Sequence, residues 1–222
     1  MTDYRAFGLS PGVKVVGEKM ATSSGIVMQN GHLQRLSLAL HGFEDTDDVF
    51  HPDPLPQFHL GTIDIRIPWI DVALCVIKDE RVTFTNKQYF TANPPKRLVT
   101  TQFVDSKLLY GTWFEAEGYT SGRVHMFYSG PAVQYHDARV RDGEAYELTQ
   151  LRRSRQYVLE NLGPDVGDAQ EGLCGAPVVH EQTQDEEMDG IVLGFVWLKD
   201  DMSLVVAAVD YLVDDGWEVA SV

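Results

Sequence analysis

Cysteine is scarce in this sequence, which has only Cys75 and Cys174 among its 222 residues. A disulfide framework is therefore excluded as the basis of the fold, and a chain of this length buries a large core without one. Residues 1–12 contain no apolar run typical of a secretory leader and are interrupted by Gly8 and Pro11. These observations predict a cytoplasmic protein whose thiols stay reduced.

Basic residues are also few, with 18 Lys and Arg against 33 Asp and Glu and a formal net charge of −15. A phosphate backbone would be repelled by most of such a surface, so we expect no nucleic-acid partner. The acidic residues gather in Glu44–Asp48, Asp185–Asp189 and Asp214–Asp215. Such runs are typical of solvated loops, and binding of a cation or a basic peptide is the alternative.

Long apolar runs and cofactor motifs are missing as well. The longest apolar runs, Ile191–Leu198 and Leu204–Val209, are too short to cross a bilayer, so no membrane partner is expected. No phosphate-binding glycine loop, Cys-x-x-Cys or His-Glu-x-x-His is present. The histidines of the first half, His41, His51 and His59, have no metal-ligand spacing. The sequence therefore predicts no metal and no cofactor.

Short segments rich in Val, Ile, Phe, Tyr and Thr alternate with clusters of Gly, Pro, Asn and Asp, which is typical of an all-β protein. The expected strands are Gly25–Gln29, Gln34–Leu40, Thr62–Ile67, Val72–Ile77, Arg81–Phe84, Tyr110–Ala116, Arg123–Tyr128, Ala145–Leu151, Ala176–Val179 and Ile191–Leu198.

The strands fall into two groups, before residue 91 and after residue 106. The double proline in Thr91–Arg97 cannot continue a sheet ladder and indicates a connection between domains. Ala207–Asp215 has helical spacing, and Gly216 follows it as a stop signal. We expect an N-terminal barrel at 1–92, a connection at 93–105, a C-terminal barrel at 106–206, and a helix and tail at 207–222.

The most informative segment is Gly172-Leu173-Cys174-Gly175-Ala176-Pro177, in which a nucleophile stands between glycines. Glycines permit backbone conformations that would clash with a Cβ, so amide groups can converge on one point, as an oxyanion hole requires. The segment resembles the Gly-Asp-Ser-Gly-Gly-Pro signature of chymotrypsin-like peptidases, with cysteine in place of serine as in the viral chymotrypsin-like cysteine proteases. The resemblance implies that the amides of Gly172 and Cys174 form the oxyanion hole.

Two further segments resemble that family, whose catalytic residues occur in the order His, Asp, nucleophile. Leu36–Gly42, an apolar strand that ends on His41, is similar to the family's Thr-Ala-Ala-His-Cys segment. Asp71-Val72-Ala73-Leu74 is similar to its Asp-Ile-Ala-Leu segment. The resemblance implies a chymotrypsin-like double β-barrel with a short C-terminal helix, in which His41, Asp71 and Cys174 form a catalytic triad.

The implied activity is that of a cysteine endopeptidase acting on protein or peptide substrates. A cysteine beside an imidazole loses its proton readily, and the thiolate attacks to form a thioester acyl-enzyme. The alternative is an inactive protease-like domain that binds peptides or partner proteins, with Cys174 as a small buried residue at a turn. For His41 the alternative is a structural histidine, and for Asp71 it is a plain loop acid or a turn cap.

The resemblance also suggests substrate-binding residues. Asp168 precedes Cys174 at the offset where trypsin-like members carry the acid that binds Lys or Arg. The strand Gly194–Lys199 resembles the family's edge strand that pairs with the substrate backbone, so Trp197 or Leu198 would wall the pocket. Ordinary β-core packing is the alternative for both. Leu173 stands where the secreted serine peptidases have an aspartate that pairs with a newly cut amino terminus, so that activation switch is not expected.

Overall fold

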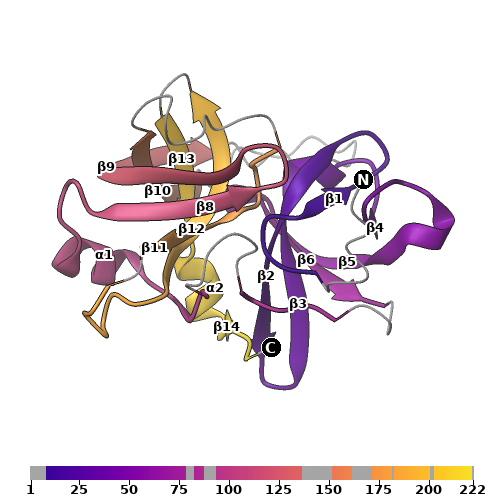
Figure 1. The fold of residues 1–222 in the computed structure, drawn as a ribbon, viewed down its shortest axis with the longest axis horizontal. Coiled ribbons are helices and arrows are strands. Elements are labelled where there is room, and N and C mark those ends of the chain that lie inside the picture. The colour runs from indigo at the N-terminus through magenta and orange to yellow at the C-terminus, as the bar shows by residue number, and fades with distance from the viewer. Residues whose placement is uncertain are drawn as a thin grey trace.

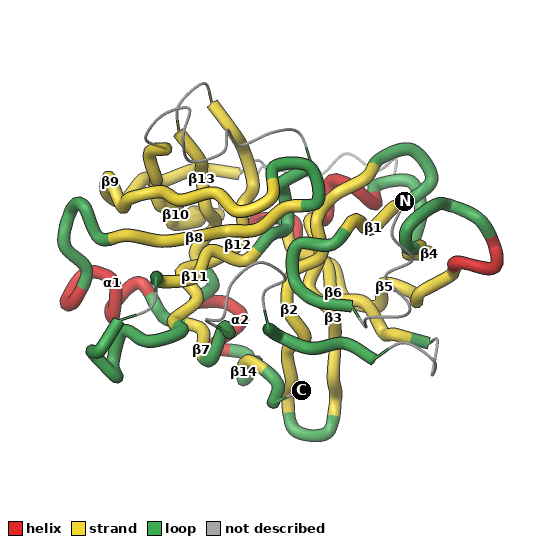
Figure 2. The backbone as a smooth tube through the Cα atoms, in the orientation of Figure 1, coloured by secondary structure: helices red, strands yellow, loops and turns green. Residues whose placement is uncertain are grey.

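The computed structural model describes residues 9–78, 83–87, 94–136, 152–161, 172–181, 183–200 and 203–221. Within these residues the chain forms two seven-stranded sheets, each containing a closed ring of six antiparallel strands (Figure 1). Figure 2 shows the predominance of strands and turns over helices. The expectation of two β-barrels is therefore confirmed.

The first barrel contains β1 (Lys14–Val16), β2 (Ala21–Asn30), β3 (Leu33–Ala39), β4 (Asp48–Phe50), β5 (His59–Ile67) and β6 (Val72–Ile77). The ring closes because β1 pairs with both β4 and β2. A late strand, β14 (Glu218–Val219), pairs antiparallel with the far half of β2. Two 3-10 helices, Leu40–Phe43 and Pro68–Ile70, stand at the ends of β3 and β5.

The second barrel contains β8 (Trp113–Gly118), β9 (Gly122–His136), β10 (Arg152–Asn161), β11 (Pro177–His180), β12 (Ile191–Asp200) and β13 (Ser203–Ala208). Pairing of β11 with both β8 and β12 closes its ring. The short strand β7 (Arg97–Leu98) runs parallel to β12. Between β7 and β8 lies helix α1 (Thr101–Lys107), which begins where the Thr100 side chain accepts a hydrogen bond from the Phe103 amide.

Apolar side chains form one core inside each barrel and a third between them. The third core joins side chains of β2 and β6, such as Met28 and Leu74, to side chains of β11 and β12, such as Val179 and Phe195, all at most 3% exposed. Burial of apolar surface is the dominant favourable contribution to such an interface. The two barrels are thereby held against each other along a continuous apolar surface.

The observed elements refine the sequence-based expectations. The segment Tyr110–Ala116 becomes a strand only at Trp113, because Gly111 has a φ of +85° and forms a turn. Phe84 makes only an isolated bridge with Leu9, and the expected strand Ala145–Leu151 lies outside the described residues, as do residues 81 and 82. The C-terminal helix is α2 (Asp210–Asp214), shorter than expected because β13 extends to Ala208. The proposed division of the chain at residues 92, 105 and 206 stays a prediction.

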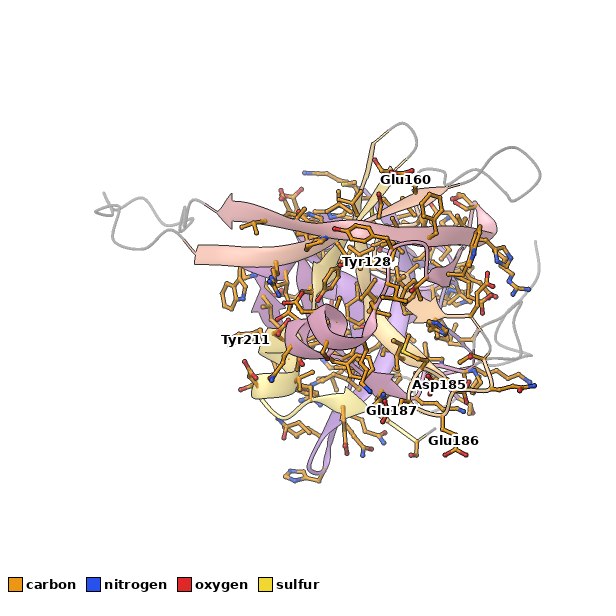
Figure 3. The ribbon with its side chains drawn as sticks, turned by 90° about the vertical axis from the view of Figure 1, so that its left-hand side faces the viewer. Tyr128, Glu160, Asp185, Glu186, Glu187 and Tyr211 are labelled. Atoms are coloured by element: carbon orange, nitrogen blue, oxygen red, sulfur yellow. The ribbon has the colours of Figure 1, made fainter. Side chains whose placement is uncertain are left out.

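The acidic turn at 185–189 lies at one edge of the molecule, where Asp185, Glu186 and Glu187 are exposed (Figure 3). Lys107 forms an ion pair with Glu187, and Lys96 forms one with Asp189. This segment is therefore the solvated loop that the charge pattern predicted. No helix in the described part of the chain is long and apolar enough to span a membrane.

Candidate active site

His41 lies at the end of β3, in the 3-10 helix Leu40–Phe43, and its orientation is set by Asp71. The Asp71 Oδ1 atom accepts the main-chain N–H of His41 at 2.9 Å, and Oδ2 lies 2.5 Å from the imidazole Nδ1. The main-chain carbonyl of Asp71 accepts the N–H of Leu40 at 2.9 Å. Three contacts thus fix this histidine segment against the start of β6.

Asp71 occupies an unusual backbone conformation between the 3-10 helix Pro68–Ile70 and β6. Its φ is 54°, in the left-handed region, and no other described non-glycine residue has a positive φ. That conformation costs free energy in residues with a Cβ, although short polar side chains adopt it more readily than others. The side chain is only 8% exposed, so the contacts with His41 offset both the strain and the burial of a carboxylate.

Cys174 lies in the turn that precedes β11, near enough to His41 to raise the pKa of its imidazole. Because Nδ1 of His41 contacts Asp71, Nε2 remains available to a group on the opposite side of the ring. The Cys174 Sγ atom also lies 3.3 Å from the main-chain oxygen of Trp197 on β12. The pKa of His41 is raised from its ordinary value to about 10, mainly by the hydrogen bond to Asp71 and to a smaller extent by the neighbouring Cys174 side chain. At neutral pH the imidazole therefore carries a proton.

The turn around Cys174 depends on its glycines. Gly172 has a φ of +95° and Gly175 a φ of +88°, both favoured only by glycine. A Cβ on Gly175 would lie 2.5 Å from the main-chain oxygen of Ser23. Among the described residues, the N–H of Cys174 donates to no main-chain oxygen. Converging amides are the arrangement that an oxyanion hole needs, and that role for Gly172 and Cys174 stays a prediction.

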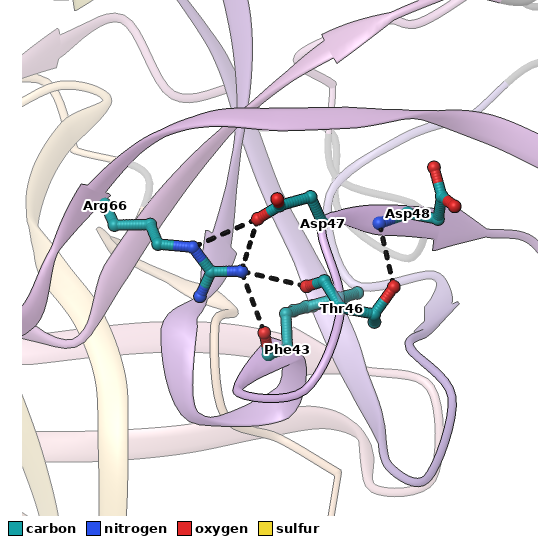
Figure 4. Close-up of polar contacts among 5 residues, drawn as sticks. All are labelled: Phe43, Thr46, Asp47, Asp48 and Arg66. Carbon is teal, nitrogen blue, oxygen red and sulfur yellow. Dashed lines mark hydrogen bonds and ion pairs between the residues drawn. The ribbon is translucent and has the colours of Figure 1, made fainter. Parts of the chain in front are cut away.

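The segment that follows His41 is held by Arg66 on β5 (Figure 4). Its Nη2 atom donates to the main-chain oxygens of Phe43 at 3.0 Å and Thr46 at 2.8 Å, and to Asp47 Oδ1 at 2.6 Å. Arg66 therefore stabilises the loop on the C-terminal side of His41, and Asp71 stabilises the residue on its N-terminal side, Leu40. Nothing in the sequence near His41 points to Arg66.

The structure brings together His41, Asp71, Cys174 and Gly172 from both barrels. The Trp197 backbone lies beside the sulfur, whereas its side chain packs, partly buried, against the core between the barrels. A role for Trp197 in a pocket wall stays a prediction. Asp168 and the side chain of Leu198 lie outside the described residues. Where the structure is described, no group of three His, Cys, Asp or Glu side chains could hold a metal ion.

Sequence reasoning missed one buried polar residue in the site, Ser23 on β2. It is 0% exposed, and its N–H donates to the main-chain oxygen of Cys174 at 3.0 Å. The available signal was a run of small polar residues, Thr22 to Ser24, that are buried in the same strand as the apolar residues Ile26 to Met28.

No protein-family model and no curated protein matches the chain. Among solved structures, a glutamic-acid-specific serine protease is similar with a TM-score of 0.63 and 11% identity, over 96% of this chain and 100% of its own. Protease A of Thermobifida fusca is similar with a TM-score of 0.59 and 14% identity, over 96% of this chain and 98% of its own. A chymotrypsin of Cellulomonas bogoriensis is similar with a TM-score of 0.58 and 12% identity, over 96% of this chain and 99% of its own.

These similarities define the class of fold. The chain has the chymotrypsin-like double β-barrel with a short C-terminal helix, as predicted. The glutamic-acid-specific neighbour is a serine protease, so these similarities support neither the cysteine nucleophile nor the resemblance to viral cysteine proteases, and both stay predictions.

Proposed function

We propose that this protein is a cysteine endopeptidase that cleaves protein substrates with Cys174, His41 and Asp71. The observation that carries the proposal is the position of the His41 imidazole, whose two sides contact an aspartate and a thiol from different barrels. In this arrangement the imidazolium favours a thiolate, which is the attacking form of cysteine. The protease fold of the neighbours supports a peptide hydrolase.

In the first step, the Cys174 sulfur forms a bond to the carbonyl carbon of the scissile peptide. The amides of Gly172 and Cys174 bind the developing oxyanion. His41 Nε2 then delivers its proton to the leaving nitrogen as the carbon–nitrogen bond breaks, which leaves a thioester. His41 next takes a proton from water, the resulting hydroxide displaces the sulfur, and the acid product leaves. Asp71 holds the imidazole tautomer throughout.

A second candidate is an inactive protease-like domain that binds peptides. It is favoured by the contact between Cys174 Sγ and the Trp197 carbonyl, an acceptor that stabilises a protonated thiol. Iodoacetamide alkylation separates the two candidates, because a thiolate alkylates rapidly at low pH and a thiol does not. Cys75 serves as an internal control, since it is 0% exposed and burial raises the pKa of its thiol to about 12.

The experiment measures the alkylation rate of Cys174 against pH by mass spectrometry in the wild type, His41→Ala and the matched control His59→Ala. His59 pairs with Asp48 away from the site. We expect rapid alkylation of Cys174 below the pH range in which an ordinary thiol ionises, lost in His41→Ala and retained in His59→Ala. Hydrolysis of a peptide library by the wild type and not by Cys174→Ala would complete the case. Slow alkylation that is unchanged by His41→Ala would contradict the peptidase proposal and favour the binding domain.

A further inference from the structure

Ser23 connects the first barrel to the loop that carries the nucleophile. It lies on β2, which Figure 1 shows on the side of the first barrel that faces the second. Its hydroxyl donates to the main-chain oxygen of Gly172 at 2.7 Å and accepts the N–H of Tyr119 at 3.2 Å. Its own N–H donates to the main-chain oxygen of Cys174 at 3.0 Å. One residue thus holds two carbonyls of the nucleophile loop.

These contacts fix the orientation of the loop's peptide groups. The third carbonyl, that of Leu173, accepts the N–H of Ala176 at 3.0 Å. Because a peptide group is planar and trans, the Leu173 carbonyl directs the N–H of Cys174 the opposite way, whereas the two carbonyls that Ser23 holds direct the N–H groups of Leu173 and Gly175. Gly172 would otherwise rotate freely, since glycine lacks a Cβ. The Ser23 hydroxyl fixes the peptide group that follows Gly172, and the Ser23 N–H fixes the one that follows Cys174. Ser23 thus anchors the loop on both sides of the peptide group that carries the Cys174 N–H.

We infer that Ser23 is a positioning residue for the oxyanion hole. It contacts neither the sulfur nor the imidazole in any hydrogen bond of the described residues, and it acts through the main chain of Gly172 and Cys174. The inference rests on the proposed function, because an oxyanion hole has a role only where acyl transfer takes place. It predicts that Ser23 affects steps that build negative charge on a carbonyl oxygen and leaves simple alkylation of the sulfur unaffected.

The neighbouring residue Ser24 provides a matched control. It is also 0% exposed on β2, and its hydroxyl also makes two hydrogen bonds, donating to the Ser10 oxygen at 2.9 Å and accepting the Val13 N–H at 3.2 Å. Both of those partners lie in the first barrel's N-terminal segment and not in the nucleophile loop. Ser24→Ala therefore removes a buried hydroxyl of the same kind from the same strand without touching the site.

The experiment compares the wild type, Ser23→Ala and Ser24→Ala as full chains, with p-nitrophenyl acetate as the acyl donor. The thiolate attacks the acetyl carbonyl, a thioester forms on Cys174, and p-nitrophenolate leaves. Both the release of p-nitrophenolate and the acetyl mass on Cys174 are recorded. Iodoacetamide alkylation of the same samples reports on the Cys174–His41 pair without an oxyanion, and thermal unfolding reports on the fold.

We expect the acylation rate constant to fall about tenfold or more in Ser23→Ala, below the roughly 10²–10³-fold cost of removing an oxyanion donor itself. The alkylation rate of Ser23→Ala and both rates of Ser24→Ala should match the wild type. Equal acylation in Ser23→Ala and wild type would overturn this inference alone. Parallel loss of alkylation and acylation in Ser23→Ala would also overturn it, since that is a general structural effect. Absence of acylation in the wild type would overturn the proposed function and this inference with it.

Discussion

Asp71 binds His41 through both carboxylate oxygens, one on the main-chain N–H at 2.9 Å and one on the imidazole Nδ1 at 2.5 Å. The first contact places the histidine backbone and the second selects the ring tautomer. A single side chain thus fixes both the backbone position and the ring orientation of His41, and the residue that carries it has a left-handed backbone just before β6.

Replacement of Asp71 by Asn separates these two effects. The amide oxygen can still accept the main-chain N–H, but the NH₂ group cannot accept from Nδ1. We expect peptide hydrolysis to fall by about 10²–10⁴-fold, the usual contribution of general acid–base catalysis. An NMR titration should show the pKa of His41 returning from about 10 towards its ordinary value. Asp64→Asn, at an exposed acid paired with Arg35, is the control and should retain full activity.

The raised pKa of His41 predicts how stability depends on pH. Because folding raises this pKa from 6.5 to about 10, the folded state binds the proton more tightly than the unfolded state. The resulting stabilisation is complete below the unfolded value and is lost as the pH rises through about 10. Urea unfolding from neutral to alkaline pH should therefore show a decline that is smaller in His41→Ala. Identical slopes in the two proteins would contradict a protonated His41.

Gly175 should tolerate no side chain. Its φ is +88°, and an added Cβ would meet the Ser23 oxygen at 2.5 Å and the Ala39 nitrogen at 2.9 Å. At the control position Gly31, φ is +58° and no atom lies within 4 Å of the added Cβ. Gly31→Ala should cost only the left-handed backbone, about 1–2 kcal/mol. Gly175→Ala should cost a further 1–3 kcal/mol or so in urea unfolding from overpacking. Equal losses would show that the loop moves away from β2 at little cost.

The loop after His41 should loosen when Arg66 is replaced by Met. The guanidinium holds the carbonyls of Phe43 and Thr46 as well as Asp47, and a thioether replaces none of these bonds. We expect faster hydrogen exchange at the amides of residues 44–48 and a stability loss of about 1–3 kcal/mol. Arg35→Met removes a comparable pair, with Asp64, and should leave that exchange unchanged. Similar exchange in both variants would contradict a specific role of Arg66 in this loop.

The candidate site residues that the sequence predicted lie in short, recognisable segments. His41, Asp71 and the Gly172–Gly175 turn each lie in a short segment whose neighbours follow a pattern, so motif order was enough to select them, and their catalytic roles stay a prediction. Ser23 and Arg66 have no such signal, because their partners lie far along the chain and are main-chain carbonyls, which any residue type supplies. Such contacts depend on the register of strands and not on local sequence.

Dependence on distant partners also explains why some strands were not predicted. Strands β7 and β14 contain two residues each and exist only because β12 and β2 offer pairing partners. Helix α1 has seven residues, too few for a clear period, and its start depends on the Thr100 cap. The longer strand β6 was predicted with its observed limits, since six consecutive buried or half-buried apolar residues follow Asp71.

Strand β14 affects the order in which the molecule is assembled during translation. The ring β1 to β6 is complete early, but the far half of β2 pairs with β14, which the ribosome adds only after all strands of the second barrel. Domains generally begin to fold as they emerge. Until β14 is synthesised, this edge of β2 in the nascent first barrel has no pairing strand. An unpaired edge can bind chaperones or pair with other chains. Its protection comes last, from a segment encoded beyond the entire second barrel.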